Sequence, residues 1–293
     1  MIGDMQRWTP NVASIIEHAK EFHPTKEVIS RMVSGDIHRT NYEEVCIRSR
    51  KLASALEKDG YKKGDVIATL ALNTYRHLEM YYGISGMGAI CHTLNFRLHP
   101  EQAVYIINHA DDKIIFCEVP FIPILEGLKD QLPCVEKYII LCDEADMPET
   151  GLKNAISYEE YINSGDEDYV WAEMDDDAAC GLCYTSGTTG NPKGVLYSHK
   201  SNILHAQASL NGMPISSDET ILMVVPLFHV LAWGIPYYGP MNGSKLVMPG
   251  MQMEGEPLYD LIDREKVTLA FGVPTIWMGL LAYCRDNLSL IHI

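Results

Sequence analysis

One short segment, residues 184–195, constrains this chain more than any other part: Tyr-Thr-Ser-Gly-Thr-Thr-Gly-Asn-Pro-Lys-Gly-Val. Glycines let the backbone turn its amides inward without a steric penalty, and successive inward amides form an anion-binding concavity. Hydroxyls add donors and can ligate a hard cation such as Mg²⁺, and lysine adds a compact positive charge. The sequence therefore predicts a cradle for a polyphosphate, formed by Thr185, Ser186, Gly187, Thr188, Thr189, Gly190 and Lys193.

The spacing in this segment excludes a Walker-type phosphate loop, which requires Gly-x-x-x-x-Gly-Lys-Ser/Thr followed by a helix. Counted from Gly187, the second required glycine falls on Pro192, and Gly194 comes after the lysine. Residues 195–199 have the composition of a strand. We therefore expect a loop between two strands. An ordinary surface turn is the alternative, and the density of Ser, Thr, Gly, Pro and Lys argues against it.

Four further segments carry a resemblance to a known family: residues 73–79, 105–110, 226–230 and 272–275. Together with the loop, they resemble the AMP-forming acyl-CoA synthetase superfamily, which also contains adenylation domains and luciferases. The loop is specific for the superfamily. The other segments look like medium- and long-chain fatty acyl-CoA ligases and the related methylthiopropionyl-CoA ligases. The resemblance extends to about residue 287.

The resemblance implies a reaction in two halves. The carboxylate of a fatty acid attacks the α-phosphate of ATP, which gives an acyl adenylate and pyrophosphate. The thiol of coenzyme A then displaces AMP and forms acyl-CoA. By similarity, Thr185 would bind Mg²⁺, and Thr188, Thr189 and Lys193 would bind the β- and γ-phosphates, where they stabilise developing charge. Lys193 and His229 are the expected catalytic residues.

The second part of the chain is expected to hold the acyl group. Residues 220–253 contain a single charged side chain, Lys245. The larger aromatic residues among them are Phe228, Trp233, Tyr237 and Tyr238. Small-molecule sites are mainly apolar, although a buried core has the same composition. The resemblance favours an acyl-binding wall over residues 220–280, with His229 at the carboxylate, Trp233 at the entrance of the acyl tunnel and Val273 against the substrate.

Charge and cysteine content limit the partners and the compartment. The net charge of −16 argues against nucleic acid and anionic membrane as partners. Eight scattered cysteines indicate free thiols in a reducing cytoplasm, because a disulfide framework belongs to small secreted domains. The Cys-x-x-Cys of Cys180 and Cys183 lacks the following helix or the second Cys/His pair that a redox or zinc site needs. We interpret residues 178–184 as a buried strand.

Two uncharged stretches, residues 220–244 and 267–284, approach the length of a membrane span. Three prolines interrupt the first stretch, and Gly272 to Pro274 divide the second into a strand and a helix. We therefore expect both stretches to lie in the interior of a soluble protein.

Alternating strand-like and helix-like runs predict an α/β fold with largely parallel sheets. The expected strands are residues 66–72, 113–118, 137–143, 195–199, 221–225, 245–248 and 269–273. The expected helices are residues 11–22, a helix opened by a capping box at Thr40 and Glu43 that ends near Asp59, a helix from residue 75, and residues 121–132, 202–210 and 258–266. Residues 149–177 look like polar surface. The resemblance implies an incomplete large N-terminal domain of the adenylate-forming fold, with one subdomain at about 45–200 and a second from about 1–44 plus 201–293.

Parts of the family pattern have no counterpart in this sequence: a second nucleotide segment ending in Thr-Glu, a ribose-binding aspartate, and a mobile C-terminal domain with a catalytic lysine. We therefore expect the 293-residue chain to be inactive alone and its full-length parent to be the ligase, with a homodimer as one option. Two alternatives remain open: a non-catalytic nucleotide-binding module, and a different adenylating enzyme such as an amino-acid-activating domain. The latter usually needs an acid in the acyl pocket, and residues 220–253 contain none.

Other residues that could suggest a site receive a structural interpretation. Glu79 and the acidic run at residues 175–177 are assigned no metal, because such a run is more often solvated surface. His109, His199 and His205 are interpreted as structural residues.

Overall fold

The computed structural model describes residues 8–185 and 191–287, in which the chain forms two sheets. The large sheet has the order β7-β6-β5-β3-β4-β8-β9 and contains β3 (Val66–Leu70), β4 (Ile90–Thr93), β5 (Ile114–Cys117), β6 (Lys137–Ile140), β7 (Ala155–Ser157), β8 (Ala179–Thr185) and β9 (Lys193–Ser198). The small sheet has the order β12-β10-β11-β1-β2 and contains β1 (Glu27–Arg31), β2 (Ile37–Asn41), β10 (Thr220–Met223), β11 (Lys245–Met248) and β12 (Leu269–Phe271). Only β2 and β9 run antiparallel to their neighbours among these strands, so the expected mixed α/β fold with largely parallel sheets is confirmed.

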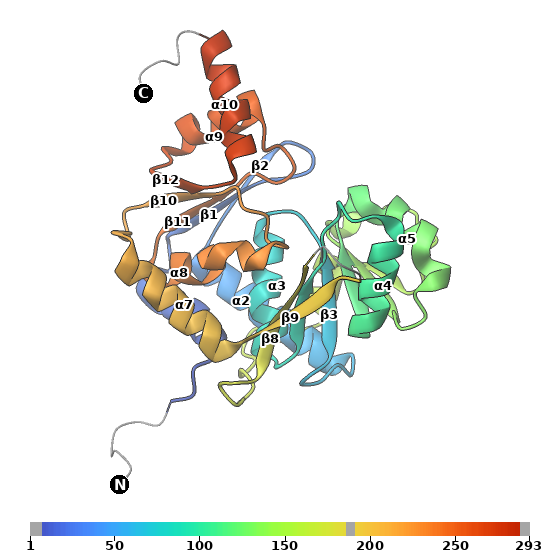
Figure 1. Cartoon of the computed structure of the whole chain (residues 1–293). Coiled ribbons are helices and arrows are strands. Elements are labelled where there is room, and N and C mark those ends of the chain that lie inside the picture. Colours follow the sequence, from blue (N-terminus) through green and yellow to red (C-terminus); the bar gives the residue numbers. More distant parts are fainter. Residues whose placement is uncertain (1–7, 186–190, 288–293) are drawn as a thin grey trace.

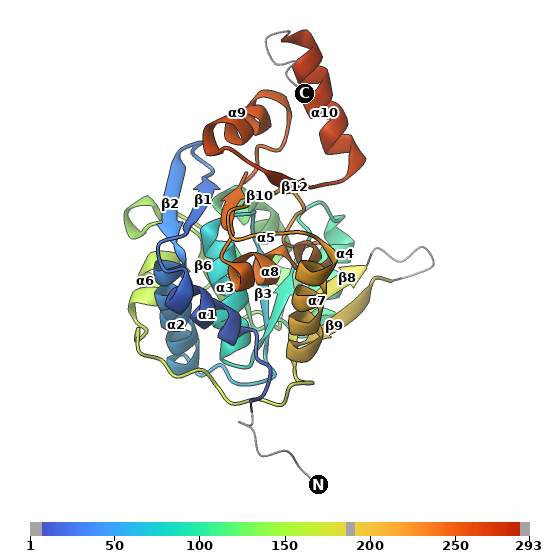
Figure 2. The ribbon, with the colours of Figure 1, turned by 90° about the vertical axis from the view of Figure 1, so that its left-hand side faces the viewer.

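The helices and sheets stack in five layers (Figure 1). The outer face of the large sheet is covered by α4 (Pro100–Ala110) and α5 (Ile122–Leu128), and that of the small sheet by α9 (Gly255–Glu265) and α10 (Pro274–Asp286). Between the sheets lie α1 (Ala13–Phe22), α2 (Tyr42–Lys58), α3 (Tyr75–Gly86), α7 (His199–Gly212) and α8 (Ile235–Asn242), and α6 (Tyr158–Asn163) packs on α2. Figure 2 shows the same layers after a quarter turn. Each interface buries its own apolar cluster, which is the usual way in which layered α/β folds are stabilised.

Most expected elements are present, with boundaries shifted by a few residues, and several short ones were missed. Residues 245–248 form β11 as expected, and the strand before the glycine-rich loop is β8. The sequence interpretation missed the β1–β2 hairpin, β4, α4 and α8. Residues 149–177, expected to be polar surface, contain β7 and α6, whose residues are partly buried. The division into subdomains near residues 45 and 200 stays a prediction. No helix of the described residues is long and apolar enough to cross a membrane.

The capping residue of α2 differs from the expectation. Asn41 is the N-cap, and its side-chain oxygen accepts from the Glu44 N–H at 2.9 Å. Thr40 is still paired in β2, and its hydroxyl donates to the Glu44 carboxylate. The expected capping box at Thr40 is therefore one residue too early, because asparagine caps at least as well as threonine and the strand occupies Thr40.

The helix α3 is buried along its entire length between the two sheets. A helix in this position is normally apolar all round, yet α3 carries Arg76, His77 and Glu79. His77 bonds to Thr69 Oγ1 at 2.9 Å and to the Leu72 carbonyl at 3.0 Å, and burial lowers its pKa to about 4. Histidine is therefore accommodated in this helix as the neutral form.

The two charged residues of α3 belong to one ion-pair network. Glu79 accepts from Arg48 Nε at 2.7 Å and from the Tyr158 hydroxyl at 2.8 Å. Glu159 accepts two bonds from Arg48, both at 2.9 Å, and a bond from Arg76 Nε at 3.0 Å. Burial raises the pKa of Glu79, although Arg48 opposes that shift. This network explains why an acid can lie inside the core, and it gives Glu79 a structural role.

Replacing Glu79 tests that role. Glu79→Gln should lower the free energy of unfolding by about 2 kcal/mol, because the buried bonds from Arg48 and Tyr158 lose their charged acceptor, while Arg48 keeps its two bonds to Glu159. The control is Asp263→Asn, which breaks an exposed pair with Lys266 and should change stability by less than about 1 kcal/mol. Urea unfolding at pH 7 measures both, and equal shifts would contradict the interpretation.

Candidate functional site

The predicted phosphate loop connects β8 and β9, which pair as an antiparallel hairpin. Thr185 and Lys193 are opposite each other at its base, where the Thr185 hydroxyl donates to the Lys193 carbonyl at 3.5 Å. A Cβ at Gly194 would lie 3.1 Å from Leu182 and 3.2 Å from the Tyr184 ring, so glycine fits the close contact there. Both Thr185 and Lys193 are exposed, and within residues 8–185 and 191–287 Lys193 has no acidic partner. The expected strand on each side of the loop is confirmed, and the antiparallel pairing of the two strands is added by the structure, while Ser186, Gly187, Thr188, Thr189 and Gly190 lie outside the described residues.

Tyr184 holds the base of this hairpin against α4. Its hydroxyl bonds to His109 Nδ1 at 2.7 Å, and its ring lies 5.1 Å from the His92 ring. His92 bonds in turn to Asp112 at 2.8 Å, and both are fully buried. His109 thus has the structural role that the sequence suggested. The contacts orient the strand that leads into the loop.

The predicted acyl and carboxylate residues follow β10. His229 is exposed and precedes η4 (Val230–Gly234), a short turn that packs on β8. The Leu231 side chain lies so close to Gly181 that a Cβ there would be 3.0 Å away. The structure therefore brings the segment of His229 and Trp233 against the strand that carries the phosphate loop.

The turn η4 has an uncommon backbone conformation. Val230, Leu231, Ala232 and Trp233 all have φ between 48° and 55°, and Gly234 follows with φ 80°. Left-handed conformations cost roughly 1–2 kcal/mol for each residue with a Cβ, so four in succession require support from the surroundings. Backbone strain of this kind clusters at functional sites. Trp233 is presented at the surface with 38% of its side chain exposed.

Val273 and the aromatic residues of the expected acyl wall divide between surface and core. Val273 follows β12, which is parallel to β10, so both strands end at the same edge of the small sheet. Its side chain is exposed. Tyr237 and Tyr238 are 1% exposed and pack in the apolar cluster between the sheets. The sequence counted them in the acyl wall, but their burial makes them core residues.

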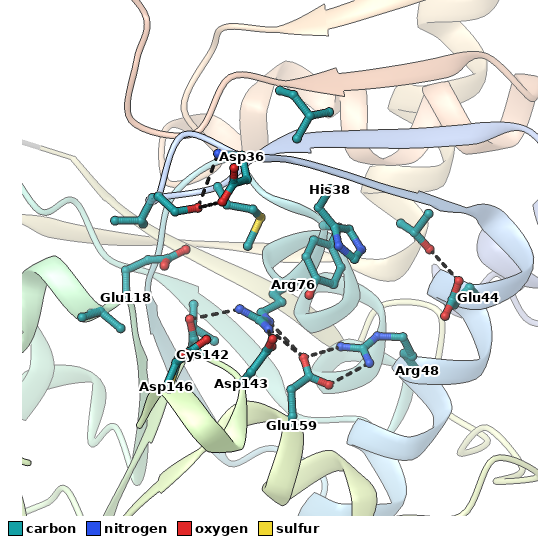
Figure 3. A pocket seen from close by; sticks show the side chains of 18 residues that line it. Asp36, His38, Glu44, Arg48, Arg76, Glu118, Cys142, Asp143, Asp146 and Glu159 are labelled. Atoms are coloured by element: carbon teal, nitrogen blue, oxygen red, sulfur yellow. Dashed lines mark hydrogen bonds and ion pairs between the residues drawn. The ribbon is translucent and has the colours of Figure 1, made fainter. Parts of the chain in front are cut away.

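A separate crevice of about 930 Å³ lies where β5 and β6 end, and none of the predicted site residues lines it (Figure 3). We call it the acidic crevice. Its charged residues are Asp36, Glu44, Arg48, Arg76, Glu118, Asp143, Asp146 and Glu159. Arg76 donates to Asp143 and to Glu159, so the arginines are already engaged. Carboxylates therefore outnumber the cations that line the crevice.

Glu118 is the buried acid of this crevice. Only 3% of it is exposed, and no described side chain pairs with its carboxylate, which Figure 3 draws without a partner. Burial raises its pKa to about 7, although Arg76 and the Leu72 backbone oppose the shift. The sequence carried a signal that was not used: Glu118 directly follows an apolar strand, and polar residues at the carboxyl ends of parallel strands often face a crevice.

Two acidic or sulfur-containing clusters have local structural explanations. Asp175, Asp176 and Asp177 place carboxylate atoms within 4.8 Å of one another, and Lys200 pairs with Asp176 and Asp177. Cys180 and Cys183 are buried in β8, as the strand interpretation expected. Burial raises the pKa of both thiols, for Cys180 to about 12.

The chain belongs to the AMP-binding enzyme family, which matches residues 16–290. The medium-chain-fatty-acid–CoA ligase of Ectopseudomonas oleovorans is 46% identical and aligns with 98% of this chain and 53% of its own length. The 3-methylmercaptopropionyl-CoA ligase of Ruegeria pomeroyi is 43% identical over 100% of this chain and 54% of its own. The long-chain-fatty-acid–CoA ligase of Thermus thermophilus is 40% identical over 94% and 50%. The resemblance to these ligases is confirmed, and the chain spans about half the length of the curated relatives it matches.

Solved structures support the fold. An anthranilate CoA ligase in complex with anthranoyl-AMP superposes with a TM-score of 0.83 at 22% identity, covering 99% of this chain and 54% of that protein. A long-chain-fatty-acid-CoA ligase from Archaeoglobus fulgidus gives 0.81 at 24% identity, covering 98% and 56%. The architecture is therefore that of the adenylate-forming fold.

Glu118 makes a pH-dependent contribution that can be measured. Its pKa is about 7 in the folded protein against an ordinary 4.5, so between these pH values the folded chain keeps a proton that the unfolded chain has released. Stability from this group is therefore lost as pH rises, by roughly 3 kcal/mol at about 1.4 kcal/mol for each pKa unit. Glu118→Gln should match the wild type in unfolding free energy near pH 4, exceed it increasingly as pH rises to about 7, and keep a nearly constant advantage above that.

The control for this experiment is Glu126→Gln. The Gly151 N–H donates to the half-buried Glu126 carboxylate and lowers its pKa, so this variant should become less stable than the wild type as pH rises towards neutral. A constant difference between Glu118→Gln and the wild type across the pH range would contradict the assignment.

Proposed function

We propose that this chain is the phosphate- and acyl-binding half of an AMP-forming acid–thiol ligase. The complete enzyme would activate a medium- to long-chain or related carboxylic acid with ATP and transfer the acyl group to coenzyme A. The observation that carries the proposal is the β8–β9 hairpin with its glycine- and hydroxyl-rich loop, in a chain 40–46% identical to acid–CoA ligases. The reaction type comes from these relatives, and the choice of acid is the finer part of the proposal.

The phosphate end of the site is assigned to the hairpin. Lys193 has no acidic partner among the described residues, so its charge is available to the β- and γ-phosphates, with Thr188 and Thr189 as further donors. The exposed Thr185 hydroxyl suits Mg²⁺, which prefers oxygen ligands and shares the rest of its shell with water and phosphate oxygens. When bound, Mg²⁺ would neutralise charge on the leaving pyrophosphate. Thr185 would hold the ion, and Lys193 would bind the phosphate oxygens beside it.

The acyl end is assigned to the residues that follow β10 and β12. His229 would contact the carboxylate and the adenylate, Trp233 would control the entrance for the acyl chain, and Val273 would contact the substrate. Support comes from the packing of η4 on β8 and from the shared edge at which β10 and β12 end. The strained turn below Trp233 adds support, since strain is retained where a side chain must be held in place.

Compartment and assembly extend the proposal. We assign the enzyme to the cytoplasm, because all eight cysteines are unpaired and seven of them are buried. A homodimer is one option for the assembly of the complete enzyme. Two rival functions differ measurably from the proposed ligase. A nucleotide-binding module would bind ATP without turnover, and an amino-acid-activating enzyme would prefer amino acids.

Lys193→Ala tests the phosphate assignment. Because the chain spans half of its relatives, the assay uses a chimera in which the second half of the Ectopseudomonas ligase follows residue 287. Loss of one preorganised electrostatic group should slow fatty-acid-dependent exchange of labelled pyrophosphate into ATP by roughly 10- to 1000-fold. Lys113→Ala, at the amino end of β5, is the control. An unchanged rate in Lys193→Ala would refute the role, and activity with amino acids alone would favour the rival enzyme.

Trp233→Ala tests the acyl assignment in the same chimera. The variant should change chain-length preference more than the KM for ATP, since each methylene in an apolar pocket is worth about 1–3 kcal/mol of discrimination. Specificity constants from butanoate to hexadecanoate would be compared with those of Phe22→Ala, an exposed aromatic residue on α1. Parallel profiles for wild type and Trp233→Ala would remove Trp233 from the site.

A further inference from the structure

A buried turn, residues 72–75, joins the two sheets; it follows β3 of the large sheet and begins α3. Three strands of the small sheet end at this turn. The Asn73 carbonyl accepts from the Gly250 N–H, which follows β11, at 3.1 Å. The Ser30 hydroxyl of β1 accepts from the Tyr75 N–H at 2.8 Å. The third contact is to the segment after β10, and it is made by the Asn73 side chain.

Both polar atoms of the Asn73 side-chain amide bond to the backbone of residues 223–227. Its Nδ2 donates to the carbonyls of Met223 and Val225 at 2.7 and 2.9 Å, and its Oδ1 accepts from the Leu227 N–H at 2.9 Å. The side chain is 2% exposed, so these bonds form away from water. The orientation of the amide is determined by its partners, because a carbonyl can only accept.

The segment that Asn73 binds begins at Met223, the last residue of β10, and continues beyond the small sheet. β10 pairs with its neighbours only as far as Met223, so the following backbone groups have no ladder partners and need others. Asn73 supplies three bonds, and the Tyr81 hydroxyl of α3 donates to the Leu227 carbonyl. His229 lies two residues beyond Leu227. The backbone that leads to His229 is thus held by the turn after β3 and by α3.

Neither a carboxylate nor a small apolar side chain reproduces this pattern of contacts. Aspartate would keep the acceptor for Leu227 but would place a carboxylate against two carbonyls, and alanine would leave three buried backbone groups unpaired. The relevant consequence is geometric. β8 of the large sheet leads into the phosphate loop, while His229 follows β10 of the small sheet, so the contact at Asn73 and the packing of η4 on β8 together hold the two segments in place.

We infer that Asn73 is a positioning residue for the ligase reaction, which holds the His229 segment in place relative to β8, the strand that leads into the predicted phosphate loop. The inference rests on the proposed function through the role of His229. Asn73 does not touch substrate in this assignment. It acts through the backbone of residues 223–227.

The first test measures the contact itself on the 293-residue chain. Hydrogen exchange of the peptide covering residues 224–234 should be at least about tenfold faster in Asn73→Ala than in the wild type, because buried bonds are lost there. Tyr42→Phe is the matched control: it removes a buried bond from α2 to the Ser244 carbonyl at the other end of the small sheet, and should leave this peptide protected. Unchanged exchange in Asn73→Ala, or an equal rise throughout the chain, would overturn the inference.

The second test measures positioning in the chimera by pyrophosphate exchange. In Asn73→Ala the kcat should fall by about 100-fold, the scale of a 1 Å misplacement. The KM for ATP should stay within about threefold, because the displaced segment follows β10 of the small sheet, whereas the phosphate loop belongs to the large sheet. A matching rise in the KM for ATP, or the same loss in Tyr42→Phe, would make Asn73 merely structural. If Asn73→Ala does not fold, Tyr81→Phe gives the same pattern with a smaller change in kcat, and no change would count against the inference. A wild-type chimera without exchange refutes the proposed function, while the hydrogen-exchange result still decides the contact.

Discussion

The structure depends on the burial of α3 between two sheets. Every residue of this helix is removed from solvent, so each polar group on it needs a partner inside the protein. Those partners come from distant parts of the chain: Arg48 from α2, Glu159 from α6, and the ends of β1, β10 and β11 at the turn before the helix. The helix therefore fixes the relative position of both sheets, because moving either sheet would break bonds that no water can replace.

This arrangement distributes the candidate site over two sheets. The phosphate hairpin belongs to the large sheet, and the residues assigned to the acyl group follow strands of the small sheet. Contact between the two parts is made by η4 on β8. A site assembled in this way can bring an anionic nucleotide and an apolar chain together from two different environments, one polar and exposed and one largely apolar.

The sequence predicted the local features well and the long-range ones poorly. The hairpin of β8 and β9 was predictable, because its loop chemistry lies within twelve consecutive residues. β1 was missed because its five residues gain their strand character by pairing with β11, more than two hundred residues away. The same limit applies to Tyr237, whose burial against Tyr81 and Tyr82 follows from the layered packing. The acidic crevice and the contacts of Asn73 join segments that no local pattern connects, whereas the roles of Lys193, His229, Trp233 and Val273 stay predictions.

The turn at residues 230–233 has left-handed backbone angles, which are usually adopted by glycine, but four residues with side chains occupy it. Glycine would adopt these angles without strain, yet the chain has Val, Leu, Ala and Trp there, which restrict the backbone of the unfolded and folded segment alike. Each Cβ raises the energy of the native turn but also reduces the number of competing conformations. The side chains therefore destabilise the native turn but narrow the range of backbone conformations open to it. Substitution by glycine would remove the strain and allow more orientations of the Trp233 indole.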